Sequence, residues 1–395
     1  MEQHISISEA DRRRGLAFVS IAAACIGFVL SAQLALNNNF LVGEIHISGF
    51  QAGLLEAVRE SQGILALGVL ALIAGLTEPL IASLVLVLVC LGLGAYSFAP
   101  SYHAVMLMSV VWSLGFHVWS PLPNSMTLAL AKPGTAGTQL GKVASAGALG
   151  SGIGLAIAFA LTLVGVPIRP LYILIGAAAA VGAAACFGIP RKIKTPGPSF
   201  VFRRRYGMYY ALNFLEGWRK QIAMAFGGFL LVNVYHAPLL VMIGLWGANQ
   251  AIGYFFSPVV GRMLDRIGER KVLTFYYFFV TCVFVVYAFV RVKYILFGVY
   301  VLDNATFVFA TGLTTYVNKI APPKEHTPTL SMGVAFNHVA SVSMPFLGGI
   351  LWATLGYQWA FLIGIPAAAA SILIVRKLPR GIAGRTALRE PGGAA

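Results

Sequence analysis

The chain has little charge and few carboxylates for its length. Charged residues make up 10% of its 395 residues, whereas they make up about 25% of ordinary soluble domains. The 13 Asp and Glu are too few to cover a large solvated surface, and 28 Lys and Arg outnumber them. This composition excludes an ordinary soluble globular protein and indicates a membrane protein.

Paired cysteines and common catalytic motifs are also lacking. Cys25, Cys90, Cys186 and Cys282 all fall inside apolar stretches without paired spacing, so neither a disulfide framework nor a metal site is indicated. The sequence contains no G-x-x-x-x-G-K-[ST] phosphate loop, which disfavours ATP as the direct energy source. It also contains no convincing Ser/His/Asp set. We therefore expect no cofactor and no enzyme activity.

What the chain does contain is long apolar runs, from end to end. Each is long enough to cross about 30 Å of hydrocarbon as a helix that rises about 1.5 Å per residue. The first run follows Arg12–Arg14, but no small-residue cleavage site ends it, so we interpret it as a retained span rather than a signal peptide. We therefore predict an all-α integral membrane protein with twelve transmembrane helices. The predicted spans are residues 15–36, 49–75, 79–98, 103–130, 138–164, 170–189, 207–233, 239–260, 272–290, 293–318, 328–353 and 357–375.

The net charge of +15 is explained by where the basic residues fall. With twelve spans and both termini in the cytoplasm, the cytoplasmic segments hold 22 of the 28 Lys and Arg, when Lys142, near the cytoplasmic end of its span, is counted with them. This is the positive-inside rule, and it accounts for the charge without a nucleic-acid partner. We expect a multi-pass protein of the cytoplasmic membrane, with Arg203–Arg205 near anionic lipid headgroups.

The longest break in hydrophobicity, residues 190–206, divides the spans into six and six. Three prolines in this break prevent one continuous helix. The predicted parts are a cytoplasmic tail 1–14, a six-helix bundle 15–190, a cytoplasmic central loop 191–206, a second six-helix bundle 207–376 and a cytoplasmic tail 377–395.

A polar island between two apolar runs carries the most informative motif. Residues 261–271 read Gly-Arg-Met-Leu-Asp-Arg-Ile-Gly-Glu-Arg-Lys. This resembles the G-x-x-x-D-x-x-G-[RK]-x-x-[RK] loop between the second and third helices of a six-helix half in major facilitator superfamily transporters. An ordinary basic cytoplasmic turn is the alternative. The resemblance implies a cytoplasmic gate, made by Gly261, Asp265, Arg266, Gly268, Arg270 and Lys271.

An offset of 193 residues relates this island to a first copy. It places Gly68 on Gly261 and Gly75 on Gly268, while Leu72 takes the place of Asp265. The first copy therefore keeps the glycines and loses the charges. Duplicated halves are a feature of the superfamily, in which two bundles rock about a central binding site.

The second span carries three charges on one helix face, Glu56, Arg59 and Glu60. An uncompensated charge near the membrane centre costs about 2.5–3.5 kcal/mol on insertion scales, so such a cluster requires a reason. One reason is proton exchange at a carboxylate beside Arg59. The other is a self-neutralising structural cluster near the outer surface.

The second half carries its embedded polar groups in three spans. Glu216, Arg219 and Lys220 lie near mid-membrane in the seventh span, where a cavity-facing site is favoured. Arg219 could bind an anionic substrate group, or Glu216 could be its permanent partner. Proton or cation coupling, or pairing with Arg219 or Lys220, explains Asp303. Further candidates are Asn304, Asn337 and His338.

In the fourth span, Trp112, His117, Trp119 and Asn124 could form an aromatic and polar wall for an organic ligand, although an aromatic stripe at helical spacing more often reflects packing. This span lacks the embedded arginine that is common in proton antiporters of the superfamily, since Val111 stands near its place. A drug/proton antiport mechanism is therefore disfavoured.

Together these features predict a secondary active transporter that moves a small organic solute by alternating access, with proton coupling as a hypothesis. The alternative is a transporter-like receptor or scaffold that does not transport. The expected partners are a small-molecule substrate, protons and the lipid bilayer, without nucleic acid, and we expect a monomer. Embedded charges of both signs are nearly balanced, so the charge of the substrate is left open.

Overall fold

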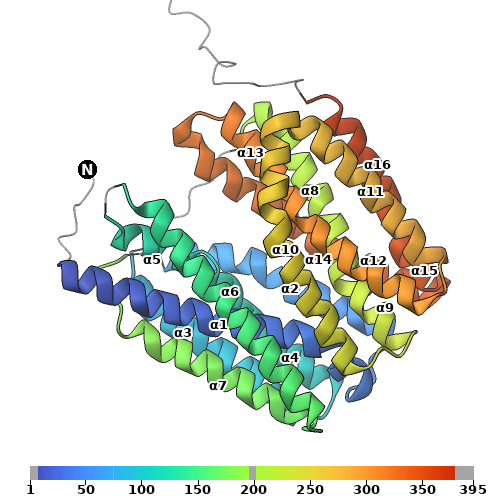
Figure 1. Ribbon diagram of the computed structural model, residues 1–395, viewed down its shortest axis with the longest axis horizontal. Coiled ribbons are helices and arrows are strands. Elements are labelled where there is room, and N and C mark those ends of the chain that lie inside the picture. The colour runs from blue at the N-terminus through green and yellow to red at the C-terminus, as the bar shows by residue number, and fades with distance from the viewer. Residues whose placement is uncertain (1–7, 74, 133, 195–201, 379–395) are drawn as a thin grey trace, which may run out of the picture. The chain divides into compact units, whose positions relative to one another are not determined.

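The structure is a computed structural model that describes residues 8–73, 75–132, 134–194 and 202–378 (Figure 1). Helices dominate this part of the chain, and the all-α prediction is confirmed. The helices of the first half are α1 Glu9–Gly43, α2 Gly49–Leu72, α3 Glu78–Gly94, α4 Tyr102–Trp119, α5 Leu122–Leu130, α6 Ala136–Leu163 and α7 Ile168–Cys186. Those of the second half are α8 Gly207–Ile222, α9 Gly228–Asn233, α10 Leu239–Ile267, α11 Glu269–Phe289, α12 Lys293–Ala305, α13 Thr311–Ile320, α14 Pro323–Leu355, α15 Tyr357–Leu362 and α16 Gly364–Val375.

Ten helical segments of the described chain are long and apolar enough to cross a membrane. Two further ones, α2 and the continuous helix formed by α8 and α9, fall outside this set because each carries three charged residues in its apolar stretch. Counting both gives the twelve spans that the sequence predicts. The chain is a multi-pass membrane protein, and the two spans outside this set are the ones that carry a cluster of charged residues.

Several spans are interrupted for local reasons. Pro121 and Pro123 separate α4 from α5, because proline lacks the backbone N–H that a continuous helix needs. A 3₁₀ segment, Thr306–Ala310, joins α12 to α13, and a π-helical segment, Ala223–Gly227, joins α8 to α9. These interruptions change the direction in which side chains point partway through a span.

The chain divides into two compact units. The first comprises residues 1–47, 58–198 and 236–247, within which α1 packs on α6 and α7, and α3 packs on α4 and α7. Glycines let two of these helices approach closely: a Cβ on Gly150 would lie 1.9 Å from the carbonyl oxygen of Ala24. Only glycine is compatible with the backbone contact between α1 and α6.

The second unit comprises residues 48–57, 199–235 and 248–395. Within it α8 packs on α14 and α16, and α11 packs on α12, α15 and α16. Gly217 brings α8 against α14, because a Cβ there would lie 2.3 Å from the carbonyl oxygen of Asn337. The predicted bundle boundaries at 15–190 and 207–376 stay a prediction.

The polar island is shorter as a loop than the sequence predicts. Helix α10 continues through the polar residues to Ile267, and α11 begins at Glu269, so Gly268 alone forms the turn. Gly268 has φ +80° and Gly75, its counterpart at the offset of 193, has φ +85°. Both occupy the left-handed region that favours glycine, which supports the proposed correspondence of the two copies.

Candidate functional site

A buried ion pair lies on α8 in the second unit. Arg219 is 1% exposed and Glu216 is 5% exposed. The Nε and Nη2 groups of Arg219 donate to Oε1 of Glu216 at 3.2 and 2.8 Å. Residues three apart share a helix face, so the helix itself holds the pair together.

A second carboxylate faces the same guanidinium. Asp303 on α12 is fully buried, and its Oδ1 lies 3.6 Å from Nη1 of Arg219, which is an ion pair but too long for a hydrogen bond. Neither oxygen of Asp303 has a hydrogen-bond partner among the described residues, and neither has Oε2 of Glu216. Two carboxylates therefore share one cation. Fully ionised, the cluster would bury one uncompensated negative charge, which is costly in a dry interior.

Aromatic side chains complete the surroundings of Arg219. The Tyr276 hydroxyl on α11 donates to Oε1 of Glu216 at 2.8 Å. The guanidinium carbon lies 5.1 Å from the centre of the Tyr276 ring and 4.6 Å from that of Phe307. Such contacts stabilise a cation that has lost its water. Tyr276 is not among the residues predicted from the sequence, because it stands in an aromatic run that is typical of packing.

The π-helical segment begins directly after this cluster. It follows Ile222, three residues beyond Arg219, and its wider turn changes the face that α9 presents. Such segments occur frequently at functional sites of helices. Lys220, the third predicted charge of α8, is half-buried.

The predicted asparagines of the second unit make structural hydrogen bonds. Asn304 donates to the carbonyl oxygen of Tyr300 on its own helix at 2.8 Å. Asn337 on α14 donates to the carbonyl oxygen of Asn213 on α8 at 3.1 Å. His338, the next residue, is half-buried. The structure therefore brings together Glu216, Arg219 and Asp303, and it gives the two asparagines packing roles.

In the first unit, α2 and α4 place a second polar cluster. Nη2 of Arg59 lies 3.8 Å from Oε1 of Glu60, and the Arg59 guanidinium lies 5.5 Å from the centre of the Trp112 ring. The hydroxyl of Ser113 donates to the carbonyl oxygen of Arg59 at 2.8 Å, which joins the two helices. Predicted residues of two different spans therefore meet.

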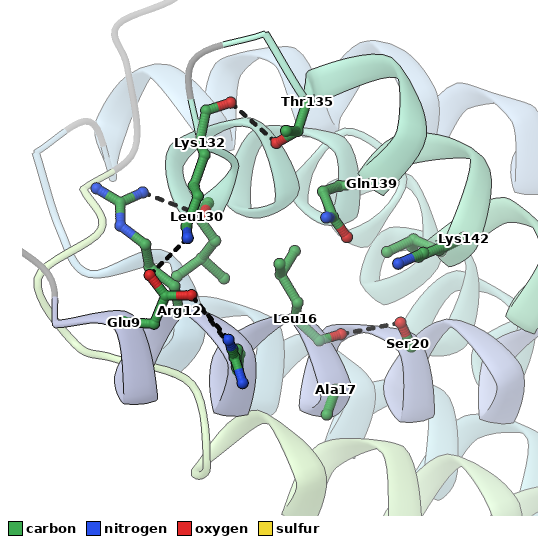
Figure 2. Close-up of a pocket in the computed structure, with 12 residues that line it drawn as sticks. Glu9, Arg12, Leu16, Ala17, Ser20, Leu130, Lys132, Thr135, Gln139 and Lys142 are labelled. Atoms are coloured by element: carbon green, nitrogen blue, oxygen red, sulfur yellow. Dashed lines mark hydrogen bonds and ion pairs between the residues drawn. The ribbon is translucent and has the colours of Figure 1, made fainter.

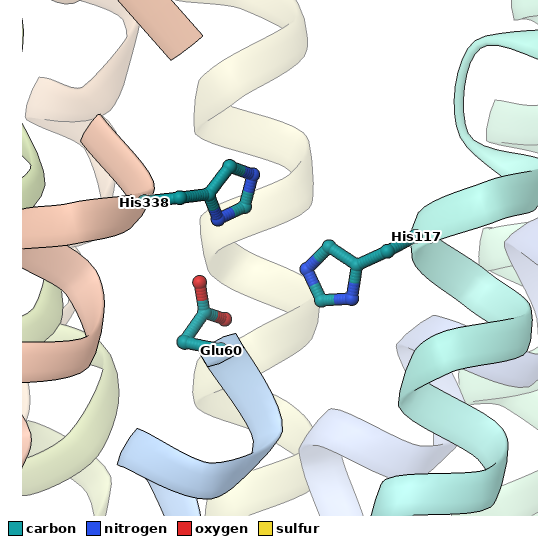
Figure 3. Close-up of side chains that lie close together, drawn as sticks. All are labelled: Glu60, His117 and His338. Carbon is teal, nitrogen blue, oxygen red and sulfur yellow. The ribbon is translucent and has the colours of Figure 1, made fainter. Parts of the chain in front are cut away.

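His117 extends this cluster along α4. Glu60 and His117 point toward each other, with a carboxylate oxygen of Glu60 within 4.8 Å of a ring nitrogen of His117 (Figure 3). Nδ1 of His117 lies 2.8 Å from the carbonyl oxygen of Ser113, so the tautomer with a proton on Nδ1 donates there and leaves Nε2 as an acceptor. His338, drawn in the same figure, belongs to the second unit.

Two further predicted residues, Glu56 and Asn124, differ in burial. Glu56 is buried on α2, in the part of that helix that belongs to the second unit. Asn124 is exposed on α5, beyond the break at Pro121. The wall predicted from span 4 therefore includes Trp112 and His117, while Asn124 stands apart from their hydrogen bonds.

Solved transporter structures share the fold. A nucleoside transporter, NupG, superposes with a TM-score of 0.76 over 92% of this chain and 99% of its own, at 13% identity. A D-xylose-proton symporter gives 0.69 over 93% and 98% at 11% identity. A POT family transporter in complex with a thioalcohol-conjugated peptide gives 0.71 over 92% and 95% at 13% identity. At these identities the likeness shows the fold.

The sequence itself also has a family match. Residues 221–392 match the family model of the Major Facilitator Superfamily. The resemblance of the chain to this superfamily is confirmed. No curated protein matches the sequence. The superfamily match covers the buried Asp303 and the whole polar island, but it begins just after Arg219.

The superfamily motif itself is largely exposed. Asp265 and Arg266 are exposed on α10, and the side chain of Asp265 makes no hydrogen bond or ion pair with any residue of the described ranges. Nη1 of Arg270 donates to the carbonyl oxygen of Leu378 at 3.3 Å, and Lys271 is exposed. A latch by Asp265 stays a prediction.

Two buried glutamates were not predicted as site residues. Glu78 is the first residue of α3 and Glu269 the first of α11, and they are 0% and 7% exposed. Ser125 donates to Oε1 of Glu78 at 2.6 Å, whereas Nζ of Lys319 lies 2.7 Å from Oε1 of Glu269. The available signal was their position shortly after Gly75 and Gly268.

Proposed function

We propose that this protein is a proton-coupled secondary transporter of the cytoplasmic membrane, which moves a small organic solute by alternating access. The observation that supports this is the buried cluster in which Glu216 and Asp303 share Arg219. One proton on either carboxylate makes the cluster neutral, whereas its departure leaves a net negative charge. A cluster whose charge balance depends on one proton is suited to coupling.

The roles of the three residues follow from their contacts. Arg219 stays charged between the two acids, and Glu216 is its closest partner, through two hydrogen bonds. Asp303 is the proton carrier, because its oxygens have no hydrogen-bond donor among the described residues and a proton would turn one of them into a donor. The cluster of Arg59, Glu60, Trp112 and His117 is proposed to bind the solute in the first unit.

The test begins by finding the solute. Thermal unfolding of the purified protein would be screened with nucleosides, pentoses and short peptides, the classes named for NupG, the D-xylose-proton symporter and the POT transporter. A solute that raises the unfolding temperature is then followed into proteoliposomes with and without a pH gradient. We expect uptake to increase with the gradient.

The decisive variant is Asp303→Asn, with Asp11→Asn, an exposed aspartate on α1, as the matched control. Asp303→Asn is expected to keep solute exchange and lose the response to the gradient, whereas Asp11→Asn keeps both. Uptake that ignores the gradient in the native protein contradicts proton coupling. Co-purification with one partner protein and no stabilising solute would instead favour a receptor or scaffold.

A further inference from the structure

A hollow of about 480 Å³ lies between α11 and α16 in the second unit. Arg270 and Lys271 from the first turn of α11 and Arg376 at the end of α16 make it basic. Phe275 and Phe278 make its other half aromatic. The proposed transport mechanism uses none of these aromatic residues.

The basic half of the hollow is not neutralised. Among the residues that the structure describes, no carboxylate lines it, and neither Lys271 nor Arg376 forms an ion pair. The hydrogen bond from Arg270 to the carbonyl oxygen of Leu378 orients that guanidinium without cancelling its charge. The cations of α11 also stand at the positive end of the helix dipole, where a bound anion is favourable.

The aromatic half continues from the basic half along one face of α11. Lys271, Phe275 and Phe278 are spaced by four and three residues, so their side chains follow one another on the helix surface. The two rings are 55% and 61% exposed. By the helical rise they lie about 6 and 10 Å beyond Lys271 along the helix axis.

The hollow also lies where a lipid headgroup would be. The candidate spans of its two helices are Glu269–Phe289 and Tyr357–Val375. Arg270, Lys271 and Arg376 therefore stand at one end of both spans, at the level of the membrane interface, while the two phenylalanines lie within the span. Basic pockets between transmembrane helices at this level suit anionic headgroups.

We propose that this hollow is a binding site for an anionic glycerophospholipid. The phosphate contacts Lys271, Arg270 and Arg376, and one acyl chain lies along Phe275 and Phe278. Charge complementarity and the order of basic and then apolar groups identify a lipid as the ligand. A soluble phosphate has no apolar part that would contact the exposed rings.

A second basic hollow in the first unit provides the contrast. It lies between α1 and α6 and also holds several cations (Figure 2). There Glu9 pairs with Lys132 at 2.5 Å and with Arg13 at 3.1 Å, and Arg12 donates to the carbonyl oxygens of Leu130 and Ala131. Three of its four cations, Arg12, Arg13 and Lys132, therefore already have acceptors inside the protein.

The test measures lipid binding to the full chain by native mass spectrometry, with phosphatidylglycerol compared against phosphatidylcholine. A Lys or Arg near the surface contributes a factor of about five to anionic lipid binding. Lys271→Gln with Arg376→Gln is thus expected to weaken phosphatidylglycerol binding about 25-fold. The control, Arg13→Gln with Lys142→Gln, likewise removes one arginine and one lysine, but from the other hollow. It is expected to leave phosphatidylglycerol binding within about twofold of the native value.

Two further arms distinguish lipid binding from general electrostatic attraction and from binding of a soluble anion. Phe278→Ala is expected to weaken phosphatidylglycerol several-fold while leaving overall charge unchanged, and it keeps the proposal testable if the double variant folds poorly. Millimolar inorganic phosphate is expected not to displace the lipid. An equal loss in the control variant overturns the proposal in favour of general electrostatics, and displacement by inorganic phosphate overturns it in favour of a soluble anion.

Discussion

Glu78 opens α3 in the first unit, and Glu269 opens α11 in the second. Each follows a left-handed glycine, Gly75 or Gly268, and each is buried. Their partners differ in charge. The hydroxyl of Ser125 donates a hydrogen bond to Glu78, whereas the ammonium of Lys319 forms an ion pair with Glu269. The buried glutamate at the start of each helix is therefore paired with a neutral donor in one unit and with a cation in the other.

This difference extends to the interior of the second unit. There Arg219, almost wholly buried, is the cation for both Glu216 and Asp303. Hydroxyls can satisfy the hydrogen bonds of a carboxylate without balancing its charge, whereas a guanidinium or ammonium does both. The second unit consequently depends on its cations for stability as well as for its proposed coupling, and this dependence can be tested residue by residue.

The largest effect is expected for Arg219→Leu. It leaves two buried carboxylates without a cation, and the loss of one partner from a buried ion pair costs about 3–5 kcal/mol. We expect the free energy of unfolding to fall by that amount, measured by thermal and denaturant unfolding in detergent. Arg219→Lys keeps a positive charge and is expected to lose less, because an ammonium cannot reproduce the paired donors of the guanidinium.

A neutralising rescue provides the control for this prediction. Adding Glu216→Gln and Asp303→Asn to Arg219→Leu removes the uncompensated charges and is expected to restore part of the stability. If Arg219→Leu unfolds like the native protein, the second unit does not depend on this cation, and the contrast between the units is lost.

The next effect compares Glu269→Gln with Glu78→Gln directly. Glu269→Gln ends the attraction to Lys319, which is partly exposed, so we expect a loss of about 1–2 kcal/mol in unfolding free energy. In Glu78→Gln the new side-chain oxygen still accepts from Ser125, so we expect a loss below about 0.5 kcal/mol. Equal losses in the two variants would contradict the difference between hydroxyl and cation partners.

The sequence predicts the fold of this chain well because hydropathy reports directly on membrane spans. The twelve runs, the all-α class and the correspondence of Gly75 with Gly268 are all visible in it. The extent of the polar island is not, because charged residues such as Asp265 and Arg266 are compatible with a helix end as well as with a loop. The sequence prediction of a longer loop is wrong for this reason, since α10 continues to Ile267.

The site is less predictable from sequence than the fold. Pairs one helical turn apart, such as Glu216 and Arg219, follow from helix geometry alone. The approach of Asp303 and Tyr276 to the same group depends on how α8, α11 and α12 pack, which spacing along the chain does not encode. Glu78 and Glu269 stand at helix ends, where a charged residue would normally meet water, so only packing reveals their burial.

The smallest effect concerns Glu325, a half-buried glutamate of the second unit whose arginine partners are exposed. Arg205 donates to Oε2 of Glu325 at 2.5 Å, and this hydrogen bond, with another from Tyr206, holds the pKa of Glu325 below its ordinary value of 4.5. A lowered pKa stabilises the folded protein above pH 4.5 and loses that contribution as the pH falls through the folded-state value.

Glu325→Gln is therefore expected to lower the unfolding temperature slightly at neutral pH and not at all well below pH 4.5. Added salt should shrink the neutral-pH difference, because the arginines are solvent-exposed and screening weakens such pairs. Thermal unfolding of both proteins across this pH range, at low and high salt, provides the measurement. A difference as large as that for Glu269→Gln would mean that a half-buried and a buried glutamate gain equally from their cations, and the burial of Glu269 would then not explain why the second unit needs Lys319.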